Sequence, residues 1–411
     1  MLNRLLLAAV LLLFPIQAEA RAAPSPITIL ISIDGFRPDY LHRGHSPRLD
    51  ALAASGASAR MRPSFPSKTF PNHWTIVTGV RPDRHGITAN RIEDPADAEH
   101  VFTMSSDDPA WWNAVPPIWV DAERAGIRTA TMFWPGSNVA WGGRERKSWP
   151  EGIEGGTRPS DWLQFNQEIS DLQRVNAVLD WLRRPAAIRP RFVTLYFDTV
   201  DTAGHNYGPA DPRTAAAVAE VDRSIGLLVD GAAALGRHVN FVIVGDHGMA
   251  EISRDRVIGL DQIAPPEDYH VVESGAYATL TPAPGREEEL AAALLRPHDH
   301  MQCWRRADIP GRFHYGTNAR IPPFLCLASL GWLIIEHLPA DFDGRGAHGF
   351  DNELPDMATL FIANGPAIRR GLRLAPFDNV DVYPLLARLI GVMPHSNDGN
   401  PATLAPILRA R

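Results

Sequence analysis

Five short apolar runs, separated by stretches with helical periodicity, constrain the fold of this chain more than any other feature. Each run is apolar at consecutive positions, as expected for a strand buried on both faces of a parallel sheet. The clearest helical stretch, residues 212–235, has apolar residues three or four positions apart and a proline at its start. Because strands and helices alternate, we expect an α/β fold with a doubly wound central sheet and helices on both faces. The predicted strands are residues 27–33, 129–134, 191–197, 239–245 and 357–363.

Residues 263–344 differ from this pattern. They contain many prolines, a short helical pattern in "REEELAAALL" and a strand-like "GWLIIEHL". We interpret them as a smaller inserted subdomain, after which the chain returns to the main core. That core would then consist of residues 27–262 and 345–411.

The N-terminus reads as a segment for export. Arg4 precedes the apolar run "LLLAAVLLLFPI", and "AEA" provides a small-residue cleavage site. The run is too short to span a bilayer, which takes about 20 apolar residues, so residues 1–20 are predicted to be a cleaved signal peptide. The protein would be secreted or periplasmic, with no membrane span after signal removal. In such an oxidising compartment Cys303 and Cys326 are expected to form a disulfide.

The charge distribution excludes some partners. The net charge is −7, and no basic groove or amphipathic basic stripe stands out. We therefore expect neither a nucleic-acid-binding surface nor a membrane-binding one.

Acidic and imidazole side chains follow the predicted strands, at the places where each strand ends. Ligands of open α/β sheets gather at the carboxyl ends of the strands. Any one of these residues alone would be more simply a helix cap or a turn residue. Together they form a set of six: Asp34, Asp201, His205, Asp246, His247 and His348.

The types of residue in this set suit zinc. Zinc takes imidazole nitrogen and carboxylate oxygen, and its catalytic sites leave one position open. Calcium and magnesium prefer more oxygen ligands and fewer imidazoles. Six protein ligands would give three to each of two Zn²⁺ ions.

Thr69 stands in "FPSKTFPNHWTIVTG", between two Phe-Pro pairs and at the expected start of a helix. A threonine hydroxyl is a poor nucleophile unless a base or a metal activates it. The free amides of a helix start favour a negative charge. Thr69 is therefore a candidate nucleophile that would complete one metal site, the alternative being a plain N-cap.

These motifs as a set resemble the nucleotide pyrophosphatase/phosphodiesterase family of the alkaline phosphatase superfamily. The match runs in the family's order from residue 28 to about residue 400. The matching pieces are "ISIDGFRPDYL", "PSKTFPNHWTIVTG", "RHGITANRI", "TMFWPGS", "LYFDTVDTAGHNYGP", "VIVGDHGM", "GAHGFDN" and "LFIANGP".

The resemblance implies an alkaline-phosphatase-like fold and a phosphodiesterase with two zinc ions. One zinc would be held by Asp34, Thr69, Asp246 and His247, and the other by Asp201, His205 and His348. Thr69 would attack phosphorus and form a phospho-threonine intermediate, which water would then release. Asn90 matches the residue that donates to a phosphoryl oxygen.

The resemblance also implies a pocket for a small-molecule phosphodiester or nucleotide. Phe70 and Tyr196 match positions that hold a nucleobase, with Phe165 as a looser match for a third wall. Larger animal relatives carry "EEPDSSGH" where this chain has "FDTVDTAGH", so the acidic run before Asp201 is altered.

Three other functions remain possible from the sequence. The same site would also suit choline-containing lipid head groups, because an aromatic cage can hold a quaternary ammonium. A non-catalytic phosphate-binding protein is a second alternative, against which the intact set of ligands argues. A phosphomonoesterase is a third, although no arginine stands beside the ligands to clamp a doubly charged phosphate.

Overall fold

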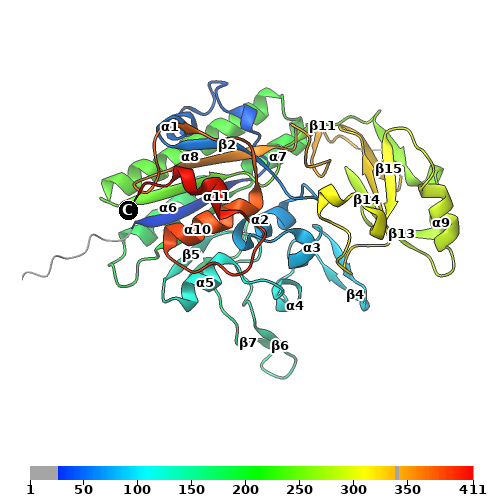
Figure 1. Ribbon diagram of the computed structural model, residues 1–411, viewed down its shortest axis with the longest axis horizontal. Helices are drawn as coiled ribbons and strands as arrows, with labels where there is room; N and C mark the ends of the chain where they lie inside the picture. The colour runs from blue at the N-terminus through cyan, green and yellow to red at the C-terminus, as the bar shows by residue number, and fades with distance from the viewer. Residues whose placement is uncertain (1–25, 338–341, 411) are drawn as a thin grey trace, which may run out of the picture.

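Within residues 26–337 and 342–410, the part of the chain that the computed structural model describes, nine strands form one central sheet (Figure 1). They are β1 (Ile27–Ile33), β2 (Ala57–Arg62), β5 (Thr129–Met132), β8 (Asp161–Leu163), β9 (Phe192–Phe197), β10 (Val239–Val244), β19 (Thr359–Asn364), β20 (Leu372–Arg373) and β21 (Phe377–Asp378). Their order is β20-β2-β19-β10-β1-β9-β5-β8, and β21 also pairs with β2. The middle strand β1 thus lies between β10 and β9.

The sheet is mixed, so the expectation of parallel strands is wrong in one place. The four predicted strands β5, β9, β1 and β10 are parallel neighbours, but the fifth, β19, runs antiparallel to both β10 and β2. The reason lies where the chain returns to the sheet. The amide of Gly248, just after β10, donates to the carbonyl of Met357, just before β19. Because β19 begins where β10 ends, it must run in the opposite direction.

Helices cover both faces of the sheet, as predicted. Along β1 the side chains alternate, so Leu30 contributes to one hydrophobic core and Ile29 and Ile31 to the other. The first core is completed by α2 (Thr69–Thr78), α5 (Ile118–Arg124), α10 (Val382–Ile390) and α11 (Pro401–Leu404). The second is completed by α1 (Pro47–Ser55), α6 (Asp171–Arg183), α7 (Thr199–Tyr207) and α8 (Pro212–Ala234).

A second sheet lies beside the main one, at the right of Figure 1. Its strands are antiparallel in the order β13-β14-β16-β15, and α9 (Glu287–Leu294) packs on its core. That core also takes in Ile252, before the predicted insert, and Met357, after it. The division at residues 262 and 344 therefore stays a prediction. The strands are β13 (Tyr269–Glu273), β14 (Tyr277–Pro282), β15 (Met301–Arg305) and β16 (Phe324–Ala328).

Short elements connect these parts. Pairs of strands are formed by β3 (Ile92–Asp94) with β4 (Asp97–Phe102), β6 (Arg144–Arg146) with β7 (Gly152–Glu154), β11 (Ala250–Glu251) with β18 (Gly346–Ala347), and β12 (Val257–Gly259) with β17 (Leu333–Ile335). One-turn helices are α3 (Pro82–His85), α4 (Pro109–Trp112), η1 (Pro38–Tyr40), η2 (Leu260–Gln262), η3 (Pro266–Asp268), η4 (Arg306–Asp308), η5 (Gly311–Phe313), η6 (Asn379–Asp381) and η7 (Ala405–Ile407).

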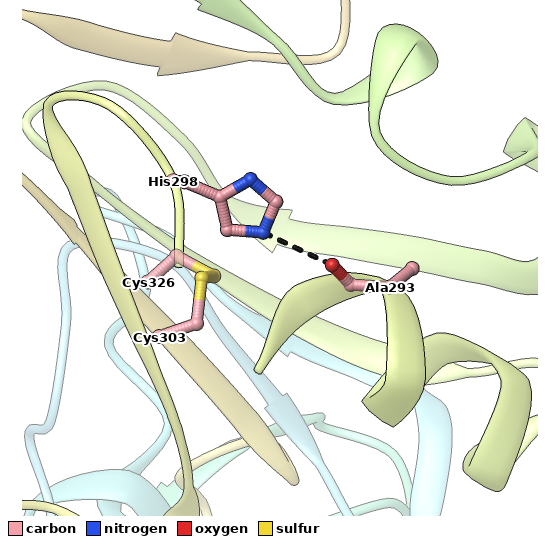
Figure 2. The surroundings of a disulfide bond; sticks show 4 residues. All are labelled: Ala293, His298, Cys303 and Cys326. Atoms are coloured by element: carbon pink, nitrogen blue, oxygen red, sulfur yellow. Dashed lines mark hydrogen bonds between the residues drawn. A yellow bond between two sulfur atoms is a disulfide. The ribbon is translucent and has the colours of Figure 1, made fainter. Parts of the chain in front are cut away.

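The predicted disulfide is present. Cys303 on β15 lies opposite Cys326 on β16, with their Cα atoms 4.0 Å apart, and the two form a disulfide (Figure 2). Nearby, His298 donates a hydrogen bond to the carbonyl of Ala293 at the end of α9 (Figure 2). His298 thus connects the loop after α9 to the end of that helix.

The predicted signal peptide, residues 1–20, lies outside the described residues. Within the described ranges, none of the helices has the length and apolar character needed to cross a bilayer.

Candidate active site

The three central parallel strands end at one edge of the sheet, and the predicted metal ligands gather there. Asp34 directly follows β1, and Asp246 and His247 follow β10. Helix α7, which begins just after β9, carries Asp201 and His205. His348 reaches the same edge because β18 pairs with β11, which follows β10 in the chain.

One cluster is centred on Nε2 of His247. This atom lies 3.3 Å from Oδ1 of Asp34, 3.0 Å from Oδ2 of Asp246 and 3.2 Å from Oγ1 of Thr69. Side chains from three distant parts of the chain thus meet around one point, and they are the four assigned to a single metal: Asp34, Thr69 and the adjacent pair Asp246 and His247.

The other three side chains form a second cluster. Nε2 of His205 lies 3.5 Å from Oδ2 of Asp201, one helical turn away on α7, and Nε2 of His348 lies 3.9 Å from Oδ1 of the same aspartate. Their ligand atoms are within 4.8 Å of one another, which is close enough to share an ion. The rings of His247 and His348 stack at 3.5 Å, so the two clusters are immediate neighbours.

The imidazoles are oriented for binding a cation. Nδ1 of His205, His247 and His348 donates to the carbonyls of Gly346, Gly248 and Ser67, at 2.8, 2.9 and 2.8 Å. A carbonyl can only accept, so the proton sits on Nδ1 and the lone pair of Nε2 faces the carboxylates. Burial lowers the pKa of all three histidines, which keeps them neutral. Backbone support of this kind is typical of metal-binding histidines.

The three carboxylates of the site are buried, and each keeps an oxygen without a hydrogen-bond partner among the described residues. Burial, and then the neighbouring carboxylates, raise the pKa of Asp34, Asp201 and Asp246 well above the usual value. A buried charge is costly unless it is paired or coordinates a metal. The donor atoms, their orientation and these unpartnered oxygens all fit metal ions, so the clusters can hold metal.

Thr69 does not cap helix α2. Lys68 occupies the N-cap position of α2, Thr69 is the first helical residue, and its hydroxyl contacts His247 instead of the helix amides. The next amide, of Phe70, donates to Oδ1 of Asn90 at 3.0 Å. Since Oδ1 accepts this bond, the Nδ2 group of Asn90 remains to donate elsewhere in the neighbourhood of Thr69.

A pocket of about 450 Å³ opens beside these residues. Asp34, Thr69 and Asp201 line one part of it, and aromatic rings line much of the rest. Of the four residues predicted to bind substrate, Phe70, Phe165 and Tyr196 line the pocket and Asn90 does not, while further rings come from residues that were not predicted to contact a substrate. The pocket aromatics are Phe70, Trp112, Phe133, Trp134, Phe165 and Tyr196.

Two functions of buried groups at the site escaped the sequence. Tyr196 was predicted only as a wall of the pocket, but its hydroxyl also donates to Oδ2 of Asp34 at 2.6 Å, so it orients a candidate ligand. His73 has Nδ1 against the carbonyl of Thr69 and Nε2 against Oγ of Ser32, both at 2.8 Å. It lies near Asp34 and Asp246, but both of its nitrogens are engaged, so it supports the backbone at Thr69.

Comparisons with known proteins agree with this arrangement. A family profile described as type I phosphodiesterase/nucleotide pyrophosphatase matches residues 28–351. The bis(5′-adenosyl)-triphosphatase enpp4 of Xenopus laevis is 37% identical over 379 residues, which cover 91% of this chain and 80% of the relative. The human bis(5′-adenosyl)-triphosphatase ENPP4 is 34% identical, with 93% and 82% covered.

Solved structures show the same fold. Human ectonucleotide pyrophosphatase/phosphodiesterase 5 superposes with a TM-score of 0.86 at 30% identity, covering 93% of this chain and all of the other. An inactive variant of the murine protein, with a threonine replaced by alanine and AMP bound, gives a TM-score of 0.87 at 29% identity, with 94% of this chain covered. The expected α/β, alkaline-phosphatase-like fold is confirmed, and the chain belongs to the type I phosphodiesterase/nucleotide pyrophosphatase family of hydrolases.

Proposed function

We propose that this protein is an exported two-zinc phosphodiesterase that hydrolyses nucleoside-5′ phosphodiester and pyrophosphate bonds through a phospho-threonine. One observation carries the proposal: the hydroxyl of Thr69 stands among buried, unpartnered carboxylates at the end of an aromatic pocket. The inactive threonine-to-alanine variant of the murine relative, solved with AMP, supports both the nucleophile and the substrate class.

The residues divide the work as follows. Asp34, Thr69, Asp246 and His247 would hold one Zn²⁺, and Asp201, His205 and His348 the other. Zinc supplies positive charge that lowers the pKa of a bound hydroxyl or water and offsets charge on the phosphoryl oxygens.

Oγ1 of Thr69 attacks phosphorus, and the bond from phosphorus to the leaving oxygen breaks as the new bond forms. Nδ2 of Asn90 donates to a non-bridging oxygen, and such a donor typically contributes about 2.7–4 kcal/mol in the transition state. Water then attacks the same phosphorus, the bond from phosphorus to Oγ1 breaks, and a proton of the water passes to Oγ1, which restores the hydroxyl and releases the phosphate product. Tyr196 holds Asp34 in place through both steps.

The pocket favours a nucleotide over a choline head group. Stacking on an aromatic ring is worth about 1–3 kcal/mol per base, and rings of this kind line the pocket. Asp198 also lines it, but this carboxylate is already paired with Arg174 at 2.7 Å. It therefore offers no free negative charge to a quaternary ammonium.

We infer export from the predicted signal peptide together with the disulfide. Disulfides persist in secreted and periplasmic proteins and are rare in the cytosol. Secretion or a periplasmic location would place the enzyme in contact with nucleotides outside the cytoplasm.

The test is a product assay on the purified mature protein with zinc present. The substrates are p-nitrophenyl thymidine 5′-monophosphate, p-nitrophenyl phosphate and p-nitrophenyl phosphorylcholine. Preference for the first supports the proposal. Preference for the phosphorylcholine ester would establish the lipid head-group activity instead, and preference for the monoester would establish a phosphatase.

Replacing the nucleophile tests the mechanism. We expect Thr69→Ala to abolish turnover while most of the bound zinc remains, because three other side chains still hold that ion. Elemental analysis and the nucleotide assay measure both quantities. Thr157→Ala, at a half-buried threonine outside the pocket, is the matched control. Near-normal turnover by Thr69→Ala would rule out the threonine as nucleophile.

A further inference from the structure

A polar group stands in the pocket among the aromatic rings and takes no part in the metal clusters. It consists of Gln167 and Asp198, both of which line the pocket, and Arg174 behind them. The proposed chemistry uses none of the three, so their arrangement calls for another role.

Arg174 anchors the group. Its side chain is only 2% exposed, and it comes from α6. Nη1 donates to Oδ1 of Asp198 at 2.7 Å and to the carbonyl of Tyr196 at 3.1 Å, while Nε donates to the carbonyl of Ile169 at 2.8 Å. With three acceptors engaged, the guanidinium has little freedom to move, and it fixes Asp198 just beyond the end of β9.

Asp198 in turn fixes the orientation of an amide. Nε2 of Gln167 donates to Oδ2 of Asp198 at 3.1 Å. A carboxylate paired with a guanidinium can only accept, so the NH₂ group must face Asp198 and Oε1 must face away from it. Oε1 has no hydrogen-bond partner among the described residues, and Gln167 is exposed in the pocket. Oε1 of Gln167 is therefore free to accept a hydrogen bond from a ligand in the pocket.

The same guanidinium supports an aromatic wall beside this acceptor. Phe165, two residues before Gln167, lies with its ring centroid 5.6 Å from Arg174 and 5.3 Å from the ring of Phe133. Phe165 is 47% exposed, so one part of its ring is free to stack on a ligand. Phe165 and Gln167 line the same pocket, so a planar ring stacked on Phe165 would share that pocket with the amide of Gln167.

We propose that Gln167 reads the edge of the nucleobase and that the enzyme prefers nucleotides whose base carries an exocyclic amino group. The inference rests on the proposed function. An amino group, as in adenine and cytosine, donates to Oε1. The corresponding position of hypoxanthine and uracil is a carbonyl oxygen, which would face another acceptor and leave both unpaired. Net values for one hydrogen bond correspond to a preference of about tenfold.

The experiment uses p-nitrophenyl esters of four nucleoside 5′-monophosphates: adenosine, inosine, cytidine and uridine. Each amino base is thus paired with its carbonyl counterpart, and kcat and KM are measured for every ester. We expect kcat/KM to be about tenfold higher for adenosine over inosine and for cytidine over uridine. The difference should lie mainly in KM, since the contact is far from the reacting atoms.

Gln167→Ala should bring both ratios to within about twofold, chiefly by weakening the two amino substrates. Asp198→Asn should also reduce them, because an asparagine can donate as well as accept and no longer fixes the amide. Gln164→Ala is the matched control, since Gln164 lines the same pocket without a carboxylate to orient it. The control should leave the ratios unchanged, whatever its overall rate.

The outcomes separate the two proposals. If none of the four esters is hydrolysed, the proposed function fails. If the esters are hydrolysed but the ratios are near one, are reversed, or persist in Gln167→Ala, this inference fails and the proposed function stands.

Discussion

At the scale of single residues, three buried aspartates determine the electrostatics of the site. Asp34, Asp201 and Asp246 are held together with no arginine or lysine as an ion-pair partner among the described residues. A folded chain without metal must protonate these carboxyls or leave them charged and poorly solvated. Metal ions would relieve this cost, so binding and stability should be linked.

Asp246→Asn tests that link. The amide can keep the contact with the backbone of Gly35 but loses the charge, so we expect metal and activity to be lost together. Metal affinity should fall by at least about 100-fold, the upper end for a residue that merely supports a ligand. Elemental analysis after dialysis measures the metal content. Asp230→Asn, on the exposed surface, is the control, and retention of both ions by Asp246→Asn would contradict the ligand set.

A second residue-scale prediction concerns acid. Burial lowers the pKa of His85, which lies outside the metal clusters, to about 3. Below pH 6.5 His85 is protonated in the unfolded chain but stays neutral in the folded chain. The free energy of unfolding therefore decreases as the pH drops toward 3, by about 1.4 kcal/mol per pH unit. His85→Gln should therefore be less stable at pH 7 but lose stability less steeply on acidification.

Denaturant unfolding between pH 7 and pH 4, with a chelator present, measures this slope. The exposed His45, changed to Gln, is the control. A slope in His85→Gln equal to that of the unchanged protein would show that His85 carries no such penalty.

The clustering of most of the candidate ligands could be predicted because they follow apolar runs that read as strands, whereas His348 precedes the last such run. The side-chain contacts that orient these and other pocket residues could not be predicted. Tyr196 donates to Asp34 across 162 positions of the chain, and Arg174 meets Asp198 only because α6 packs against β9. Nothing local in the sequence marks such pairs.

At the scale of elements, the segment before α2 joins Thr69, the proposed nucleophile, to the second sheet. Phe65 packs against the rings of Tyr277 and Phe313. Nζ of Lys68 lies 3.3 Å from Oε1 of Glu273 on β13, and both side chains are nearly buried. The strands of residues 263–344 thus support the position of Thr69.

Glu273→Ala should therefore lower activity without touching the metal clusters. It leaves the charge of Lys68 unpaired next to Thr69, and a displacement of the nucleophile by about 1 Å can reduce kcat by roughly 100-fold. We expect a loss of about 10- to 100-fold in kcat with unchanged zinc content, measured by the nucleotide assay and by elemental analysis. Glu287→Ala, in an exposed ion pair on α9, serves as the control; equal activity in the two variants would show that the pair has no role in positioning.

Element prediction succeeded where strands are buried on both faces. Four of the five predicted strands match the central sheet in place and direction. Strands β2 and β8 were missed because neither has a long apolar run: β2 contains Arg60 and Arg62, and β8 has only three residues, of which Trp162 and Leu163 are exposed. The direction of β19 depends on where the chain re-enters the main sheet after the second sheet. Hydrophobic periodicity carries no information about that position.

At the scale of the whole molecule, two parts of the fold, each built on its own sheet, stabilise different parts of the site. The sheet with its two helical layers positions the carboxylates, while the second sheet supports the segment before Thr69. The disulfide ties β15 to β16 within this second part.

Removing the disulfide should weaken the second part first. Closing a loop of 23 residues contributes roughly 3 kcal/mol, so the double variant Cys303→Ala/Cys326→Ala should unfold at lower denaturant. These are the only two cysteines of the chain, so a reducing agent should lower the midpoint of the unchanged protein and leave that of the double variant where it is. An unchanged midpoint on reduction would show that the disulfide adds nothing to stability.

The carbonyl that His348 contacts belongs to Ser67, 281 positions earlier in the chain. At about 5–20 residues per second, a ribosome would need roughly 15 to 55 s to make the intervening stretch. During that time the nascent polypeptide would carry its nucleophile but lack a ligand of the second centre. If the proposed function is correct and the chain is exported during translation, the complete active site could form only after most of the chain had left the cytoplasm. The order of synthesis would then prevent the enzyme from hydrolysing the nucleotides inside the cell.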